Sequence, residues 1–206
     1  MSVVIILTTT VYPQNKCFIH QSNPVKRIES YLKSIHQWLE HTLLPIVVVE
    51  NSGYTFPELK NVESDRFQIV TFNESIDAPP LVVNNSKGAS ELWSIKNIKK
   101  YITPFDYVIK ITGRYFIPHF EKWLIRLNGV DVIRQNTPLR CEVIGCNIKH
   151  FDYLFNDSTL LNGNECNHIE FLYQYRLNRF HKTLIFPEMP IEPTCMGGIE
   201  KMVYSL

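Results

Sequence analysis

Polar side chains follow three apolar runs of this sequence, at the points where those runs stop. They belong to the segments Thr8–Tyr12, Glu50–Gly53 and Thr112–Tyr115. In open α/β sheets, ligands bind at the carboxyl ends of the strands. Hydroxyl groups and the aromatic ring of the first segment could hold a base or a sugar, although threonines also simply end strands. Arg114 is the first candidate for a functional residue, and the alternative is a surface arginine paired with a carboxylate.

Two helix starts carry further groups that could act on a ligand. Lys87 could meet a phosphate at a helix N-terminus, or it could be a solvated loop lysine. Near the start of the last long helix, Glu165, His168 and Glu170 are able to move protons or bind hydroxyl groups. Glutamates near helix starts are also simple partners of the helix dipole, so a structural explanation stays open for each of them.

Two segments have the hydrophobic period of an amphipathic helix, and these helices must position the polar groups. Asn23-Pro24 opens the first, because asparagine can cap free amides and proline at the first helical position loses no hydrogen bond. Its expected apolar face consists of Val25, Ile28, Leu32, Ile35 and Leu39. The second helix begins near Lys87-Gly88 and is stopped by Pro104, and its apolar face consists of Leu92, Ile95, Ile98 and Ile102.

Short apolar runs rich in β-branched residues predict strands that are buried on both faces of a parallel sheet. These runs are Val3–Leu7, Ile46–Val49 and Tyr107–Ile111, and an alternating run at Phe67–Phe72 predicts one more strand. The first strand, the first helix and the second strand make a right-handed βαβ unit. The sequence therefore predicts an α/β fold with a mostly parallel central sheet flanked by helices.

The remaining segments have weaker patterns. A polar loop is expected at Asn73–Asn85, and little regular structure is expected from Phe186 onward. Gly145 is available for a bulge or a turn. The expected elements are short helices at Pro118–Leu127 and Asp152–Leu161, a strand at Val130–Arg134, another at Arg140–Ile144 and its continuation, and a helix at His168–Phe180.

Length and composition limit the possible function classes. The 206 residues fit one domain covering 1–206, and 45% hydrophobic with 20% charged residues is close to the globular average. A net charge of +1 gives no field that would recruit nucleic acid. The five cysteines show no CxxC spacing and indicate free thiols, so we expect a reducing, cytoplasmic location. The apolar run at the N-terminus is too short for a membrane span.

The order of these residues resembles the nucleotide-sugar glycosyltransferases of the GT-A fold, in particular the family 2 type and viral or bacterial surface-polysaccharide enzymes. In that family, the loop after the first strand lies under the nucleotide, which corresponds here to Thr9 and Tyr12. An acidic residue after the second strand holds the base or ribose, which corresponds to Glu50. A metal-binding Asp-x-Asp is expected near the end of the later strand, but this chain has Ile111-Thr112-Gly113-Arg114 there. The resemblance therefore leaves metal dependence open.

The resemblance implies a nucleoside-diphosphate sugar donor, with uridine diphosphate the first choice, and a glycan or glycoprotein acceptor. Glu170 would be the carboxylate base, with His168 and Glu165 as rivals, and a single base implies inversion at the sugar carbon. Arg114, with Lys87 or Lys110, would stabilise the leaving phosphates in place of a cation. Lys110 is the weaker candidate because its position within the strand can direct it to the opposite face. Manganese or magnesium stays possible, with Asp77 as a candidate ligand.

Two other functions remain open. Loss of the aspartate pair would suit an inactive domain that binds a nucleotide sugar or a glycan without transferring it. A nucleotidyltransferase is the other alternative, although no GxGxxG motif follows the first strand. The enzyme that we expect would act in the cytoplasm of a bacterium or of a virus-infected host cell.

Overall fold

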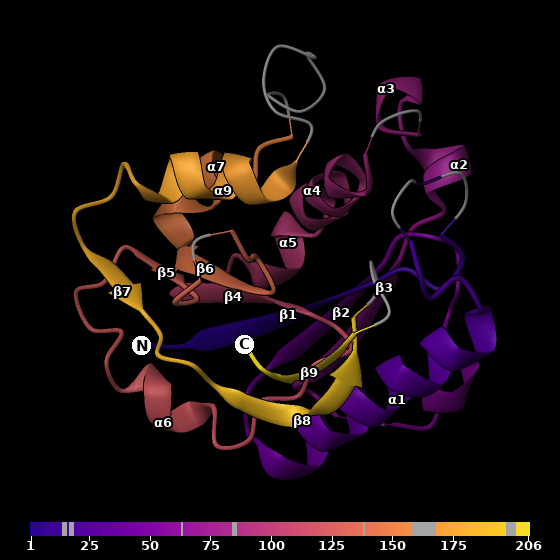
Figure 1. Cartoon of the computed structure of the whole chain (residues 1–206), viewed down its shortest axis with the longest axis horizontal. Helices are drawn as coiled ribbons and strands as arrows, with labels where there is room; N and C mark the ends of the chain where they lie inside the picture. The colour runs from indigo at the N-terminus through magenta and orange to yellow at the C-terminus, as the bar shows by residue number, and fades with distance from the viewer. Residues whose placement is uncertain are drawn as a thin grey trace.

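The computed structural model describes residues 1–13, 16, 19–62, 64–83, 86–137, 139–157, 168–196 and 201–206. In this part of the chain, seven strands form one sheet in the order β3-β2-β1-β4-β6-β5-β7 (Figure 1). These strands are β1 (Val3–Thr9), β2 (Ile46–Glu50), β3 (Phe67–Thr71), β4 (Tyr107–Thr112), β5 (Val132–Arg134), β6 (Val143–Asn147) and β7 (Thr183–Ile185). The expected α/β fold with its mostly parallel central sheet is confirmed.

Strand β1 lies between β2 and β4 and is parallel to both. Thr9 pairs with Glu50 of β2, and Thr8 pairs with Thr112 of β4. This register places the carboxyl ends of the three strands side by side. The three polar segments that follow these strands in the sequence therefore meet at one edge of the sheet.

Strand β6 runs antiparallel to β4 and β5, whereas β7 pairs parallel to β5. Because β6 is antiparallel, the residue before it lies beside the end of β4, and the amide of Thr112 donates to the carbonyl of Glu142 at 2.9 Å. The strand expected at Arg140–Ile144 and its continuation therefore begins only at Val143 and continues to Asn147. Gly145 is neither a bulge nor a turn but pairs with Ile109, and a Cβ there would lie 2.6 Å from the carbonyl oxygen of Val108.

Helices cover both faces of the sheet (Figure 1). Helix α1 (Pro24–His41) packs on one face, and the Asn23 side chain accepts from the amides of Val25 and Lys26 as expected. The other face carries α4 (Lys87–Asn97), α5 (Lys99–Ile102), η2 (Ile148–His150), α7 (Phe151–Leu154) and α9 (Ile169–Leu177). The apolar face predicted for α4 and α5 is buried, although the two helices are separate. Two apolar clusters form the core, one on each face of the sheet.

The predicted face of α1 was partly wrong. Val25 is 61% exposed, because the buried side of the helix runs through Arg27, Tyr31, Ser34, Ile35 and Trp38. Tyr31 and Trp38 are large enough to reach the sheet, and Arg27 is buried with them because its guanidinium finds carbonyl and hydroxyl partners.

Other segments are more regular, or shorter, than the sequence predicts. The expected loop at 73–85 contains α2 (Glu74–Asp77) and α3 (Pro80–Val83), and a turn of 3-10 helix, η1, covers Pro57–Leu59. Helix α6 covers only Glu121–Leu124 of the predicted 118–127 helix. From Phe186 onward the prediction was wrong, because β8 (Pro190–Cys195) and β9 (Met202–Ser205) pair antiparallel. Buried Phe186 and Met189 anchor this tail to the core beneath α1.

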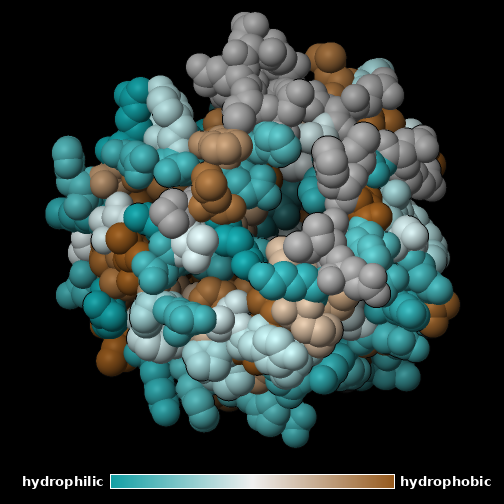
Figure 2. Space-filling model, viewed as in Figure 1, coloured by the Kyte–Doolittle hydropathy of each residue, from teal (hydrophilic) through white to brown (hydrophobic). Residues whose placement is uncertain are grey.

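No helix in the described ranges is long and apolar enough to cross a membrane. On the face in Figure 2, mostly hydrophilic residues surround a hollow near the centre.

Candidate functional site

A cleft at the carboxyl ends of β1, β2 and β4 has two adjoining lobes, each with a cavity volume of about 230 Å³. Both lobes are lined by Thr10, Ile19, Asn51 and Lys87, which marks them as parts of one cleft. Their combined volume is within the range of roughly 300–1,000 Å³ that is usual for small-molecule sites. The cleft lies where the sequence predicts a ligand.

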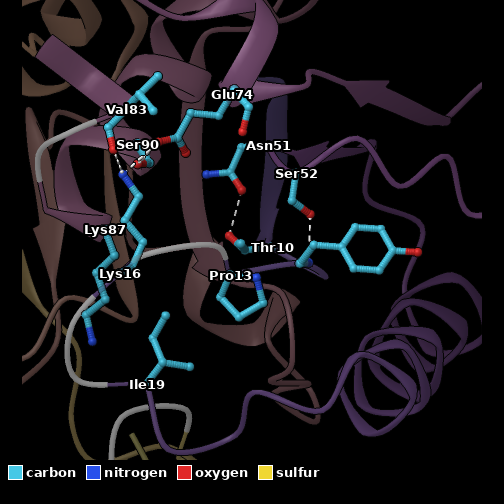
Figure 3. A pocket seen from close by; sticks show the side chains of 12 residues that line it. Thr10, Pro13, Lys16, Ile19, Asn51, Ser52, Glu74, Val83, Lys87 and Ser90 are labelled. Atoms are coloured by element: carbon cyan, nitrogen blue, oxygen red, sulfur yellow. Dashed lines mark hydrogen bonds and ion pairs between the residues drawn. The ribbon is translucent and has the colours of Figure 1, made fainter. Parts of the chain in front are cut away.

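The first lobe lies over β1 and β2, and Figure 3 shows its lining. Lys16 and Lys87 stand on one side of it, and Thr10, Asn51 and Ser52 stand on the other. The hydroxyl of Thr10 donates to the side-chain oxygen of Asn51 at 2.7 Å. Tyr12, which is 39% exposed, lies at the rim, with its ring edge-on to the ring of Tyr54 at 6.0 Å. This lobe offers aromatic and amide groups of the kind that bind a nucleobase.

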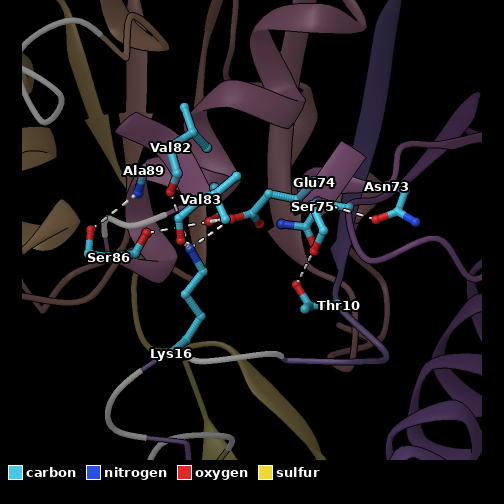
Figure 4. Close-up of polar contacts among 11 residues, drawn as sticks. Thr10, Lys16, Asn73, Glu74, Ser75, Val82, Val83, Ser86 and Ala89 are labelled. Carbon is cyan, nitrogen blue, oxygen red and sulfur yellow. Dashed lines mark hydrogen bonds and ion pairs between the residues drawn. The ribbon is translucent and has the colours of Figure 1, made fainter. Parts of the chain in front are cut away.

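Lys16 closes one wall of the first lobe (Figure 4). Its ammonium lies 2.7 Å from a carboxylate oxygen of Glu74 and donates to the carbonyls of Val82 and Val83 at 3.2 and 2.9 Å. The same oxygen of Glu74 accepts from the hydroxyl of Ser90 at 2.8 Å. This network ties the segment after β1 to α2, α3 and α4. It was not visible in the sequence because its members are far apart along the chain.

Arg114 lines the second lobe, directly after β4. Its backbone is fixed on both sides, because the amide of Gly113 donates to Thr8 at 2.9 Å and the indole of Trp38 donates to the carbonyl of Tyr115 at 2.9 Å. Among the described residues, the Nε of Arg114 is buried and has no hydrogen-bond partner. No carboxylate in the described part of the chain forms an ion pair with Arg114, and its role at a ligand stays a prediction.

Lys110 lies at the base of the second lobe and is only 1% exposed. Its ammonium is 2.9 Å from a carboxylate oxygen of Glu91 and donates to the carbonyl of Cys141 at 2.8 Å. Burial is the largest single effect on Lys110 and opposes its charge, but the attraction and hydrogen bond of Glu91, with Cys141 and Glu142, together raise the pKa of Lys110 above its ordinary value. As expected, the Lys110 side chain points to the face of the sheet opposite to that of Ile111, toward α4. This face of the sheet also lines the cleft.

Glu50 is fully buried at the end of β2. Its carboxylate accepts from the amides of Val11, Ser52 and Tyr54 at 2.8–2.9 Å, and from the Ser52 hydroxyl. Burial raises the pKa of Glu50 despite these hydrogen bonds. The carboxylate therefore shapes the loops under the first lobe, and its predicted contact with a base or ribose stays a prediction.

Arg27 is a buried residue of the site that the sequence did not reveal. Its guanidinium donates to the carbonyls of Thr10 and Gln21 at 2.5 and 2.8 Å and to the hydroxyl of Tyr31 at 2.8 Å. Burial lowers the pKa of Arg27. Thr9, the residue predicted from the sequence, is 3% exposed and donates to the carbonyl of Val49, although it also lines the second lobe. Arg27 thus holds the end of β1 in place.

The two candidate bases on α9 occupy different positions. Glu170 lines the second lobe, whereas His168 is exposed, does not line either lobe, and packs edge-on against Phe171. Glu165 lies outside the described residues. Glu142 also lines this lobe, and one of its oxygens accepts from Arg140 at 2.8 Å. Apart from its place in a predicted strand, no feature of the sequence marked Glu142 as a residue of the cleft.

Among the solved structures that are similar to this chain are the following three, and each match covers 91% of the chain. A protein assigned as a nucleotide-diphospho-sugar transferase of Desulfovibrio desulfuricans G20 has 14% identity, a TM-score of 0.52 and 80% of its own length covered. A glycosyltransferase involved in the glycosylation of the major capsid of PBCV-1 has 7% identity, a TM-score of 0.53 and 82% covered. A cytidylyltransferase of Leptospira borgpetersenii serovar Hardjo-bovis has 12% identity, a TM-score of 0.51 and 76% of its own length covered.

This chain has a GT-A-like fold. No protein-family model matches the sequence, and no curated protein matches it. The likeness therefore rests on the arrangement of strands and helices. It shows the fold of this chain and no more than the fold.

Gly113 lies within the segment after β4 where the resemblance leads us to expect a metal-binding Asp-x-Asp. A Cβ at Gly113 would lie 2.7 Å from Cγ2 of Thr9 and 2.8 Å from the carbonyl oxygen of Thr8, so an aspartate does not fit there. Close packing, not flexibility, explains this glycine.

The described residues contain no group of three or more His, Cys, Asp or Glu that could hold a metal ion. The cleft carboxylates of Glu74 and Glu91 are each paired with a lysine. Asp77 is exposed, does not line either lobe, and accepts from the backbone amide of Asn73 at 2.7 Å. Its proposed role as a metal ligand has no support from neighbouring groups.

Proposed function

We propose that this protein transfers a sugar from a nucleoside-diphosphate donor to a hydroxyl group of a glycan or glycoprotein. The observation that carries the proposal is Arg114, which lines the cleft of a GT-A-like fold and whose buried Nε has no hydrogen-bond partner among the described residues. Leaving a buried donor unsatisfied costs about 1–3 kcal/mol or more, so such a group indicates a binding partner. A phosphate oxygen is the natural partner of a guanidinium.

The charges of the cleft support one orientation of the donor. Lys87 lines both lobes and stands at the N-terminus of α4, where the helix dipole also favours an anion. The diphosphate would lie between Lys87 and Arg114, where the two lobes adjoin. The base would then occupy the first lobe near Tyr12 and Asn51, and the sugar would extend toward the carboxylates of the second lobe.

The proposed reaction needs a base and stabilisation of the leaving group. The acceptor oxygen forms a bond to the anomeric carbon, the bond from that carbon to the β-phosphate oxygen breaks, and the nucleoside diphosphate leaves with the electron pair. The acceptor proton passes to Glu170, which lines the sugar end of the cleft. Arg114 and Lys87 would stabilise the charge on the phosphates. Direct displacement would invert the sugar carbon.

Lys110 has a supporting part in this proposal. Its charge is balanced by Glu91, so it adds less to the potential at the phosphates than Arg114 does. It instead holds Glu91 and the segment at Cys141 in place under the sugar. No step of the proposed reaction uses a metal ion.

The likeness to a cytidylyltransferase makes nucleotidyl transfer the second candidate. Incubation with a panel of nucleotide sugars, followed by measurement of released nucleoside diphosphate, tests the first function. Incubation with nucleoside triphosphates and sugar 1-phosphates, followed by measurement of pyrophosphate, tests the second. Pyrophosphate release alone would replace glycosyl transfer by nucleotidyl transfer, and binding without either product would support an inactive binding domain.

The cellular setting also belongs to the proposal. Cys141, Cys146 and Cys195 are free thiols, which agrees with action in a reducing compartment such as the cytoplasm of a bacterium or of a virus-infected cell.

A further inference from the structure

An apolar pocket lies beside α6, and we call it the α6 pocket. Its volume is about 390 Å³, larger than that of either lobe of the cleft. Ile117, Pro118, Trp123 and Pro190 form its apolar lining. None of its lining residues also lines a lobe of the cleft, so the two sites are separate.

The segment that carries the α6 pocket is anchored to the core by one side. Phe120 and Leu127 are buried, and the ring of Trp123 lies 6.3 Å from the ring of buried Phe186. The other side of the segment faces solvent, and its exposed residues include His119, Lys122, Ile125 and Arg126. The pocket therefore belongs to a fixed part of the surface.

Two strongly exposed apolar side chains lie next to α6. Among the described residues, Leu43 and Ile125 are the most exposed large hydrophobic residues, at 84% and 83%. Leu43 follows α1, and its amide donates to a carboxylate oxygen of Glu121 at 2.8 Å, which brings it beside α6. Single exposed apolar residues are normal, but two of them beside an apolar pocket form a patch that indicates a partner.

The charged side chains that line the α6 pocket are basic. His119, Lys122 and Arg126 line it at spacings of three and four residues, and no carboxylate lines it. Within the ranges that the structure describes, neither Lys122 nor Arg126 forms an ion pair. Glu121, the acidic residue of this segment, is engaged with the amide of Leu43. The patch therefore offers two positive charges that no carboxylate neutralises there.

This combination suits the surface of an anionic membrane. Anionic headgroups attract lysine and arginine, whose apolar stems lie along the hydrocarbon boundary while their charges stay in water. Exposed leucine and isoleucine side chains enter that boundary, and tryptophan favours the interface because one end of its ring system is polar.

We infer that the α6 pocket, with Leu43 and Ile125 beside it, docks this protein on the surface of a membrane that contains anionic lipids. Leu43 and Ile125 enter the acyl boundary, Trp123 lies at the interface, and Lys122 and Arg126 contact the phosphate groups of the lipids. This inference does not rest on the proposed glycosyl transfer.

Sedimentation with vesicles tests the inference. The wild type should bind vesicles of phosphatidylcholine with about one third phosphatidylserine, and salt should weaken this binding. The double variant Lys122→Gln with Arg126→Gln should bind them about 30-fold more weakly, since each cationic side chain contributes a factor of about five. The wild type should lose a similar factor on phosphatidylcholine alone. Ile125→Glu should bind the anionic vesicles more than about tenfold more weakly, because it removes an apolar side chain from the bilayer.

Ile76→Glu is the matched control. Ile76 is 78% exposed and belongs to α2, which lies far from α6 in Figure 1. It should bind vesicles as the wild type does. All of these substitutions change exposed side chains, so unfolding in urea should match the wild type. Because the α6 pocket is separate from the cleft, the double variant and Ile125→Glu should also keep the wild-type affinity for nucleoside diphosphates.

Trp123 provides a second readout. The other two tryptophans, Trp38 and Trp93, are buried, so a blue shift of the emission on binding to vesicles should come from Trp123. The shift should be absent from Trp123→Phe.

Several results would overturn the inference. A wild type that binds neither kind of vesicle, or both equally, has no site for an anionic membrane. Equal binding by the wild type, the double variant and Ile125→Glu would place any membrane contact elsewhere. A wild type that forms dimers, does not bind vesicles and becomes monomeric in Ile125→Glu would show that the patch is an interface between two copies of this chain.

Discussion

Gly88 is the point at which the first turn of α4 packs against the start of α9. A Cβ at this position would lie 2.6 Å from Cβ of Ile169 and 3.1 Å from its Cγ2. Ordinary contact begins at 3.4 Å, so the contact must open by about 0.8 Å. Ile169 is 6% exposed and precedes Glu170, which means that Gly88→Ala should displace the proposed base.

The effects of Gly88→Ala on stability and on activity should differ. Overpacking costs about 1–3 kcal/mol, but alanine stabilises a helix interior by up to about 1 kcal/mol relative to glycine. The net loss in the free energy of unfolding should therefore be about 0–2 kcal/mol. A misplacement of about 1 Å can lower turnover roughly 10²-fold. We expect a fall of that order, with the affinity for nucleoside diphosphate within about threefold of wild type.

Gly129→Ala provides the control. Gly129 has a φ of +73°, and no atom lies within 4 Å of a Cβ built there. The substitution should cost about 1–2 kcal/mol of stability through its backbone conformation and leave turnover unchanged. Urea unfolding and donor hydrolysis measure the two quantities. Wild-type turnover in a folded Gly88→Ala variant would refute the reasoning, because it would show that the start of α9 does not position the chemistry.

Three other predictions concern the base, the metal and pH. Glu170→Gln should lower turnover about 10²- to 10⁴-fold with donor affinity little changed, while His168→Ala stays near wild type; the reverse result would transfer the role to the histidine. Turnover should persist in EDTA, and full loss with recovery in manganese would show that carboxylates unassigned here bind a metal. Burial raises the pKa of Glu50, so the stability it contributes is present below its ordinary pKa of 4.5 and is lost as pH rises through the higher folded value. Urea unfolding between pH 4.5 and that higher pKa should show the free energy of unfolding falling as pH rises in the wild type and not in Glu50→Gln. An equal change of this free energy with pH in the two proteins would count against the prediction.

The central strands were predictable because burial on both faces leaves a plain signal. Val3–Thr9 and Tyr107–Thr112 are apolar runs flanked by polar residues, and their positions in the sequence nearly match the observed strands. The hairpin of β8 and β9 gave no such signal. Its residues pair with each other and pack on α1, and these contacts depend on the tertiary structure.

The site was predictable to the extent that strand ends carry it. Arg114 and Glu170 both line the cleft, and so do Thr9, Tyr12 and Lys87. Arg27 was missed because it does not lie on the apolar face predicted for α1, whereas the observed buried side of the helix includes it. Only the contacts made after folding distinguish such a buried polar residue from an exposed one.

The central claim is that a nucleoside diphosphate binds in the cleft through Arg114, and calorimetry tests it most directly. Uridine, cytidine, guanosine and adenosine diphosphates are titrated into the wild type, and the tightest is then titrated into Arg114→Ala and into Arg126→Ala, an exposed control outside the cleft. Loss of a charge-assisted hydrogen bond of about 1.5–3 kcal/mol predicts roughly 10- to 150-fold weaker binding in Arg114→Ala and no change in the control. Equal affinity in all three proteins, or no binding of any of the four to the wild type, would contradict the claim.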